Sequence, residues 1–162
     1  MKPTPEQIKG ALPHVHYEIE SLLLTPKYDE SDKALEESVY FRKMAHCPVL
    51  HDFFTTSGLD RRDDDILCED FGFPAQALYG NDAKSLLARF NKDLFHLTYA
   101  RLERTPATKP WPMGLLFPPV CKRSHMFIAH VLKSPSLRIA DAEMKCWTGY
   151  ASFGSVLQAS VC

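Results

Sequence analysis

Scarce glycine together with abundant proline is the feature that most constrains the fold of this chain. Among 162 residues there are 7 glycines and 12 prolines. Tight β-hairpins depend on glycine for backbone conformations with positive φ, so a hairpin-rich sheet is disfavoured. The prolines cluster between long stretches of apolar residues at helical spacing, where proline begins or ends a helix. The sequence therefore predicts an all-α fold.

Two helices are predicted in the first third of the chain. Thr4 before Pro5 is typical of a helix start and predicts a helix over roughly 5–25, which Pro13 restarts or kinks. Ser31 is able to cap a second helix, and Pro48 is expected to kink or split that helix. The apolar residues of the second helix are Leu35, Val39, Val49, Leu50 and Phe53. Of these, Leu35, Val39, Leu50 and Phe53 are predicted core residues.

The rest of the chain is expected to add helices to the same bundle. Residues 55–80 read as a loop, whereas residues 83–104 keep an uninterrupted helical pattern. A proline pair is expected to open a fourth helix over 118–134. We predict a single four- to five-helix bundle over 1–135, followed by a short helix and a loosely docked C-terminal tail over 136–162.

The charge balance of the chain limits its partners. Lys and Arg number 19 and Asp and Glu number 20, a formal charge of −1. A non-specific DNA or RNA coat protein needs a strongly basic face, and this balance excludes that class. The acid-rich run over 60–65 reads as a solvated connector. No apolar run approaches the ~18 residues of a membrane span and no secretory layout opens the chain, so a cytoplasmic protein without a membrane partner is expected.

The cysteines and histidines favour free thiols over a metal site or a disulfide framework. The five cysteines are an odd number at wide, unequal spacing and include no CxxC pair. A structural zinc site normally has two closely spaced ligand pairs, which this sequence lacks. We therefore expect no metal and no cofactor. A helical binder of a metal or a small molecule ranks last among the function classes, because the sequence shows neither a closed ligand set nor a large apolar cavity.

A polar line borders the apolar face of the helix predicted at 83–104. On a helical wheel that face consists of Ala83, Leu86, Leu87, Phe90, Leu94 and Leu97, of which all but Ala83 are predicted core residues. Arg89 and His96 are seven residues apart and differ by only about 20° around the helix, with Asp93 between them. They combine a permanent cation, an orienting acid and a group that titrates near neutrality. The line predicts a site, with ordinary boundary charges of an amphipathic helix as the alternative.

Three stretches between residues 35 and 115 resemble small uncharacterised bacterial helical proteins, in the same order along the chain. That group is similar to the HEPN superfamily, whose helical bundles carry an arginine and a histidine separated by four to six residues. Arg89 and His96 enclose six. The resemblance implies a homodimer that pairs this helix across a two-fold axis, and a metal-independent ribonuclease of a toxin or antiphage type. The three stretches are Leu50–Phe54, Asp64–Phe71 and Ala88–Arg101.

The resemblance also implies roles for individual residues. His96 would exchange protons with a ribose 2′-hydroxyl or a leaving 5′-oxygen, and Arg89 would stabilise charge on the phosphate. Asn91 and Asp93 are weaker members of this catalytic set. RNA is the implied partner, and DNA is excluded because it lacks the 2′-hydroxyl. Other HEPN proteins are non-catalytic binding or dimerisation modules, and Phe90 favours that alternative because catalytic members often have a polar residue there.

A second group of candidates lies mainly on the second predicted helix. Arg42 and His46 are four residues apart on its apolar side, where polar groups need partners. In one interpretation they form a second wall of the pocket, and in the other they make a salt bridge between helices or a histidine–carbonyl bond. Asp52 is a third candidate. Arg101 belongs to a basic region around the third predicted helix that suits phosphate.

Overall fold

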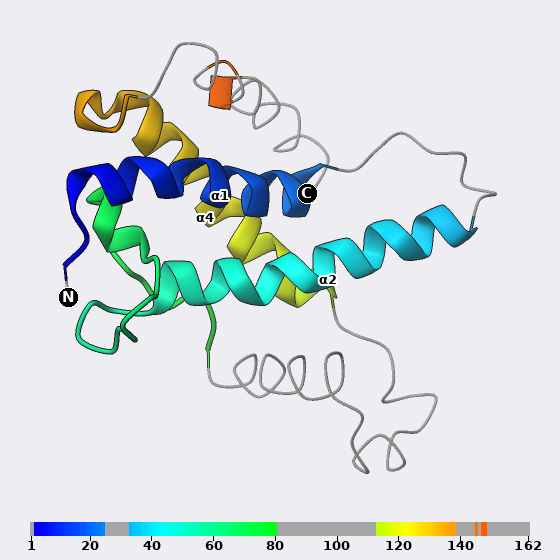
Figure 1. Cartoon of the computed structure of the whole chain (residues 1–162). Coiled ribbons are helices and arrows are strands. Elements are labelled where there is room, and N and C mark those ends of the chain that lie inside the picture. The colour runs from blue at the N-terminus through cyan, green and yellow to red at the C-terminus, as the bar shows by residue number, and fades with distance from the viewer. Residues whose placement is uncertain (1, 25–32, 81–112, 139–144, 146, 149–162) are drawn as a thin grey trace.

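Helices are the only regular elements in the part of the chain that is described. The computed structural model describes residues 2–24, 33–80 and 113–138 together with Lys145, Trp147 and Thr148. Within these residues there are three α-helices, two 3-10 helices and no strand, which confirms the all-α prediction for this part (Figure 1). The α-helices are α1 (Pro5–Leu23), α2 (Lys33–Thr55) and α4 (Met113–Lys133), and the 3-10 helices are η1 (Cys68–Phe71) and η3 (Pro135–Leu137).

Helix α1 begins where the sequence predicts. The Thr4 hydroxyl accepts a hydrogen bond from the Gln7 amide at 3.3 Å, and the Gln7 side chain accepts one from the Thr4 amide at 2.8 Å. This capping box satisfies two amides at the start of the helix. Pro13 lies within α1, which continues past it to Leu23.

Helix α4 begins earlier than the sequence suggests. The prediction that Pro118 and Pro119 open this helix is wrong, because α4 starts at Met113 and contains both prolines. Each proline removes the hydrogen bond to the carbonyl four residues before it, here those of Gly114 and Leu115. Both of these residues lie at the exposed start of α4, where water can replace the missing donors.

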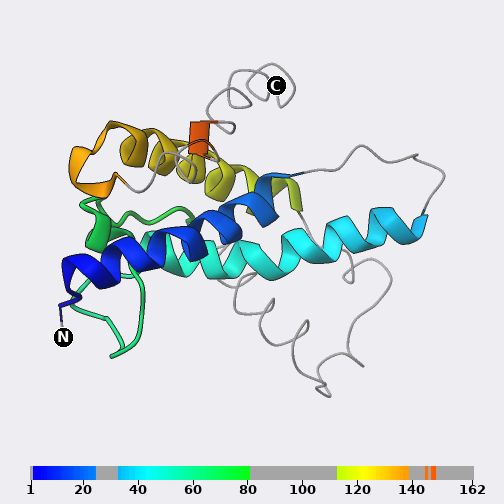
Figure 2. The ribbon, with the colours of Figure 1, turned by 45° about the horizontal axis from the view of Figure 1, so that its top comes forward.

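Helices α1 and α2 run antiparallel and α4 packs against both of them (Figures 1 and 2). At the centre lies Phe127 of α4, which is fully buried. Its ring contacts Phe53 and Phe54 of α2 and Phe71 and Phe73 of the following segment, with centroid separations of 5.2, 6.0, 5.5 and 5.4 Å. The interplanar angles of 66–89° are the edge-to-face arrangement that aromatic rings prefer.

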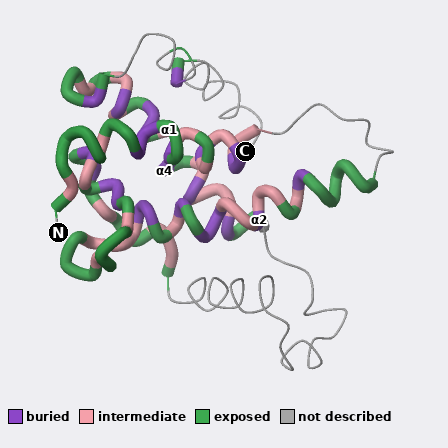
Figure 3. Tube along the Cα trace, viewed as in Figure 1, coloured by how far each residue is buried: buried purple, intermediate pink, exposed green. Residues whose placement is uncertain are grey.

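The apolar residues of α2 are buried only in part, and the core prediction is wrong at Leu35. Val39, Leu50 and Phe53 are buried, whereas Leu35 and Val49 are 38% and 51% exposed. Leu35 is exposed because the N-terminal part of α2 extends past the end of α1, so that residues 33–38 face solvent (Figure 3). For Val49 the cause is angular. Along α2 the fully buried Cys47 and Phe54 lie at the centre of the buried face, and Val49 is about 150° away from them around the helix.

The segment between α2 and residue 80 is the predicted loop, with one short helix inside it. The 3-10 helix η1 ends at Gly72, whose φ of 71° is the left-handed conformation that closes many helices. The Phe71 carbonyl lies 2.8 Å from Nε2 of His130 on α4, and this hydrogen bond attaches the loop to the bundle. The core also includes Leu137 of η3 and Trp147. The predicted core residues of the third helix, Leu86, Leu87, Phe90, Leu94 and Leu97, lie outside the described residues.

Candidate functional site

The predicted catalytic set falls in a part of the chain that the structure does not describe. Arg89, Asn91, Asp93 and His96 lie outside the described residues, as does Arg101. These five assignments remain predictions. The structure does place Arg42, His46 and Asp52, all on α2.

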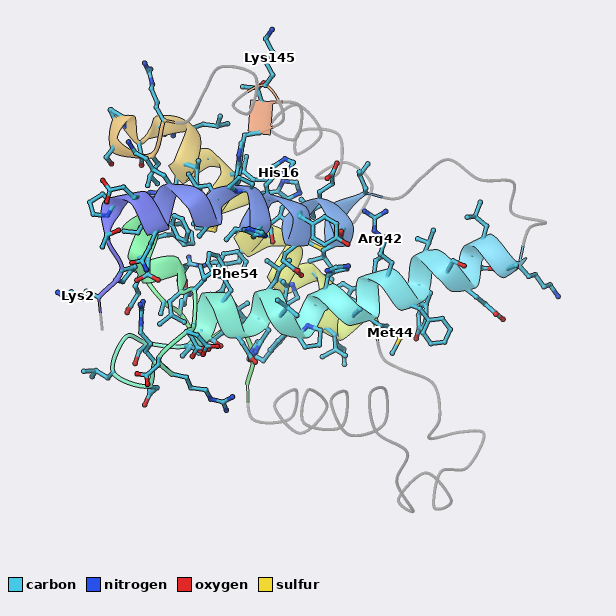
Figure 4. The ribbon with its side chains drawn as sticks, viewed as in Figure 1. Lys2, His16, Arg42, Met44, Phe54 and Lys145 are labelled. Carbon is cyan, nitrogen blue, oxygen red and sulfur yellow. The ribbon has the colours of Figure 1, made fainter. Side chains whose placement is uncertain are left out.

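Arg42 and His46 join α2 to α1. The Arg42 guanidinium donates a hydrogen bond to the buried Ser21 hydroxyl at 3.2 Å, and Figure 4 shows its side chain reaching toward the end of α1. His46 Nδ1 lies 2.7 Å from a Glu18 carboxylate oxygen, and the Tyr17 ring meets the imidazole edge-on at 5.5 Å. These bonds are a contact between helices, as one of the two interpretations expects, and the pocket interpretation stays a prediction because Asp93 and His96 lie outside the described residues. These bonds satisfy polar groups that would otherwise be unpaired at a helix interface.

Asp52 is an exposed residue at the edge of a groove. Its side chain is 72% exposed, and one carboxylate oxygen lies 2.9 Å from Nδ1 of His51. The His51 ring in turn stacks on Tyr79 at 5.3 Å. Asp52 does not contact Arg42 or His46 in any interaction between described residues. It instead belongs to the wall of a cavity that was not predicted from the sequence.

This cavity, here called the acidic groove, has a volume of about 660 Å³ and lies between α1, α2 and the loop over 56–67. Its apolar lining includes the buried residues Val15, Leu50, Phe53 and Leu67. Five carboxylates line it against a single guanidinium, that of Arg62. Those carboxylates belong to Glu18, Asp52, Asp60, Asp64 and Asp65.

Short-range hydrogen bonds hold the loop that forms the outer wall of the acidic groove. Asp60 accepts from the Ser57 hydroxyl at 2.8 Å, and Asp65 accepts from the Arg62 amide at 2.9 Å. Glu69 accepts from the Gly58 amide at 2.7 Å. The run over 60–65, predicted to be a solvated connector, is therefore mostly exposed and is held by hydrogen bonds to nearby groups of the same loop.

One pair in this loop is well shielded from water. Arg61 forms an ion pair with Asp70, and their side chains are only 13% and 9% exposed. The second Asp70 oxygen accepts from the Leu67 amide at 3.0 Å, which fixes the start of η1. The Arg61–Asp70 pair thus attaches the charged run to η1. Asp64 is exposed and makes no hydrogen bond or ion pair to any described residue.

A buried thiol–phenol cluster lies on the other side of α2. The Leu116 carbonyl of α4 accepts a hydrogen bond from the Tyr79 hydroxyl, and Cys47 Sγ lies 3.8 Å from the same oxygen. Burial raises the pKa of Cys47 to about 12 and that of Cys121 to about 11. Both thiols therefore stay protonated at neutral pH and are poor nucleophiles. The described cysteines, Cys47, Cys68 and Cys121, are free.

A buried arginine on α4 contacts the segment that follows η1. Arg123 on α4 is 5% exposed, donates to the Pro74 carbonyl and places its guanidinium 4.1 Å above the Phe73 ring. These contacts fasten the segment after η1 to α4 through a hydrogen bond and a cation–π interaction.

The described residues contain no group of three His, Cys, Asp or Glu side chains arranged to hold a metal ion. No helix among them is long and apolar enough to span a bilayer. A scan against protein-family models and searches of curated proteins and of solved structures return no match to this chain. The arrangement that remains on the described surface is the acidic groove, which is suited to a positively charged ligand. A signal for it was present in the sequence, since His14 and Glu18 are one helical turn apart and the run over 60–65 is acidic.

Proposed function

We propose that this chain is a HEPN-like helical protein in which Arg89 and His96 carry metal-independent ribonuclease activity of a toxin or antiphage type. The observation that carries the proposal is the spacing of these two residues, which enclose six others and lie on one side of a predicted helix. The all-α character of the described residues is compatible with a HEPN-like bundle.

The proposed chemistry needs an acid, a base and a cation at one phosphate. His96 takes the proton from the ribose 2′-hydroxyl, and Arg89 stabilises the charge that builds on the phosphate. A homodimer supplies a second His96 to protonate the leaving 5′-oxygen. Asp93 and Asn91 orient these groups. The acidic groove repels phosphate, so the proposed RNA path follows basic residues such as Lys92 and Arg101.

Ribonuclease assays of paired variants test this proposal. We expect the wild-type chain to cleave RNA in EDTA, to leave 2′,3′-cyclic phosphate or 3′-phosphate ends, and to spare matched DNA. His96→Ala and Arg89→Ala should each lower the rate of RNA cleavage at least about 100-fold. Arg138→Ala, which removes an exposed arginine elsewhere, serves as the control and should stay active. Equal activity in all four proteins, or cleavage that EDTA abolishes, would refute the assignment.

A non-catalytic HEPN-like binding or dimerisation module is the second candidate. Two observations favour it: Phe90 follows Arg89 directly, and Arg42 and His46 are engaged with α1. Sedimentation at micromolar concentration and the cleavage assay separate the candidates. A stable dimer without cleavage of a panel of RNAs supports the module, and cleavage lost in His96→Ala supports the enzyme.

A further inference from the structure

The acidic groove has an apolar floor that reaches the surface. Val49 and Ile66 line it and remain 51% and 43% exposed. They come from different elements, α2 and the loop, and line the same cavity as the buried Phe53. Apolar side chains that stay exposed inside a concave surface are typical of a binding site.

The groove continues beyond its main cavity. A second cavity of about 380 Å³ shares His14, Asp64, Asp65 and Ile66 with it and extends toward Lys2 at the start of the chain. The two cavities adjoin, and the residues of α1 that line them extend from Gln7 to Glu18. Such a shape fits a peptide segment that presents several side chains in a row better than a compact small molecule.

The charge of the groove selects the sign of its occupant. Its main cavity has five carboxylates against one guanidinium, while the whole chain has a net charge of only −1. The carboxylates come from both helices and from the loop, with Glu18 on α1, Asp52 on α2 and Asp64 between the two cavities. Lysine or arginine side chains complement such a rim, whereas nucleic acid and anionic lipid are repelled by it.

We infer that the acidic groove binds a basic amphipathic peptide segment of a partner protein. Apolar side chains of the segment cover Val49 and Ile66, and its lysines or arginines lie against Glu18, Asp52 and Asp64. This interaction is independent of the proposed ribonuclease, because none of these residues belongs to the Arg89–His96 set. A protein with the two activities would bind its protein partner and its RNA on surfaces of opposite charge.

Fluorescence anisotropy with a synthetic probe tests the inference. The probe is a short labelled peptide with leucine and lysine at helical spacing, compared with versions that have glutamate for lysine or serine for leucine. The full chain should bind the leucine–lysine peptide and should bind neither of the other two measurably. Asp52→Asn combined with Asp64→Asn should weaken binding by about fivefold in low salt.

Matched variants distinguish the groove from a general charge effect. Glu36→Gln combined with Glu37→Gln removes the same charge from an exposed part of α2 outside the groove and should leave affinity within twofold. Val49→Thr should weaken binding, whereas Leu59→Thr, at a residue that is 97% exposed and outside both cavities, should not.

Several results would overturn the inference. If the groove variant and the Glu36/Glu37 control lost the same affinity for the peptide, the peptide would be attracted non-specifically by negative charge. If spermine displaced the peptide and bound as tightly as the peptide does, the groove would be a site for a small cation. If an RNA oligonucleotide displaced the peptide, the argument that the carboxylates select a basic ligand would be wrong. Concentration-dependent dimerisation that Val49→Thr abolishes would assign the surface to a second copy of the chain. Retained peptide binding in Arg89→Ala/His96→Ala separates this test from that of the ribonuclease.

Discussion

His46 on α2 and Glu18 on α1 meet at 2.7 Å, beside the groove that Glu18 lines. One carboxylate thus belongs both to the contact between two helices and to the wall of a cavity. The bond holds the imidazole in a fixed position, with the Tyr17 ring against its edge. A substitution at Glu18 therefore affects both stability and the charge of the groove.

We expect the Glu18–His46 pair to stabilise the bundle measurably. His46→Ala should lower the free energy of unfolding by about 1 kcal/mol, because it removes a hydrogen bond to a carboxylate and a ring contact. In a double-mutant cycle with Glu18→Gln the two losses should not add. Asp52→Asn, at a side chain that is 72% exposed, is the control and should change stability by less than about 0.5 kcal/mol. Strict additivity in chemical denaturation would contradict the pairing.

Phe127 should be the most sensitive residue of the described core. Phe127→Ala removes a ring that contacts four other phenylalanines and should cost about 3–5 kcal/mol of unfolding free energy. Met126→Ala changes the neighbouring residue, which is 47% exposed, and should cost less than about 1 kcal/mol. Thermal denaturation of the two variants side by side makes the comparison, and similar melting temperatures would contradict this core.

Gly72 should resist substitution because of its backbone conformation. At a φ of 71° a side chain is strained, so Gly72→Ala should destabilise the protein by about 1 kcal/mol. Gly10→Ala, within α1 and with no atom near the added methyl group, should instead stabilise it by roughly 0.5–1 kcal/mol. Opposite shifts in melting temperature are the expected result. Equal shifts would show that the end of η1 does not need a left-handed residue.

Stability should fall steeply at alkaline pH. Burial raises the pKa of Cys47 to about 12 and the pKa values of Cys68 and Cys121 to about 11, above the ordinary value of 9.0. Above pH 9 the unfolded chain releases these protons and the folded chain keeps them, so the contribution to stability is complete below pH 9 and is lost as pH rises to 11–12. Lys43 opposes this trend, since burial lowers its pKa, but it is one group against three thiols.

Urea denaturation across alkaline pH checks this dependence. We expect the free energy of unfolding to decrease by roughly 2 kcal/mol between pH 9 and pH 10.5. In Cys121→Ala, which removes one thiol that is only partly accessible, the decline should be shallower. A profile that is flat over this range would mean that the thiols are not protected from ionisation in the folded state.

A milder loss is expected on the acid side. Burial lowers the pKa of His125 below its ordinary value of 6.5. The unfolded chain therefore takes up this proton first, and stability should decrease as pH falls through 6.5. His125→Gln should reduce the slope between pH 7 and pH 5. An unchanged slope in this variant would assign the acid sensitivity to other groups.

The sequence predicts most helices of the described part but misplaces some of their faces. Local signals were sufficient for α1, because its capping box and first-turn proline are short-range features. The core of α2 was predicted incorrectly at Leu35, because the start of α2 extends past the end of α1 and spacing along one helix does not report where its neighbour ends. The start of α4 was misjudged because proline is tolerated near an exposed helix end.

The groove was not predicted, for a physical reason. Its walls come from two helices and a loop, and only their relative placement brings His14, Asp52 and Asp64 around one cavity. Spacing along the sequence predicts which residues share one face of a single helix, as for Arg89 and His96. It says little about which elements contact each other. A contact between helices was one of the expectations for His46, but Glu18 was not predicted as its partner.

In the loop, the side-chain hydrogen bonds and the ion pair that start from Ser57, Gly58, Arg61 and Arg62 connect residues only 3 to 11 positions apart. Closing such short loops loses little chain entropy, so the outer wall of the groove is determined almost entirely by its own stretch of sequence. A wall that is already ordered does not have to be immobilised when a ligand arrives. The same stretch, moved with its flanking residues between two helices of another bundle, should therefore carry its shape and its charge with it.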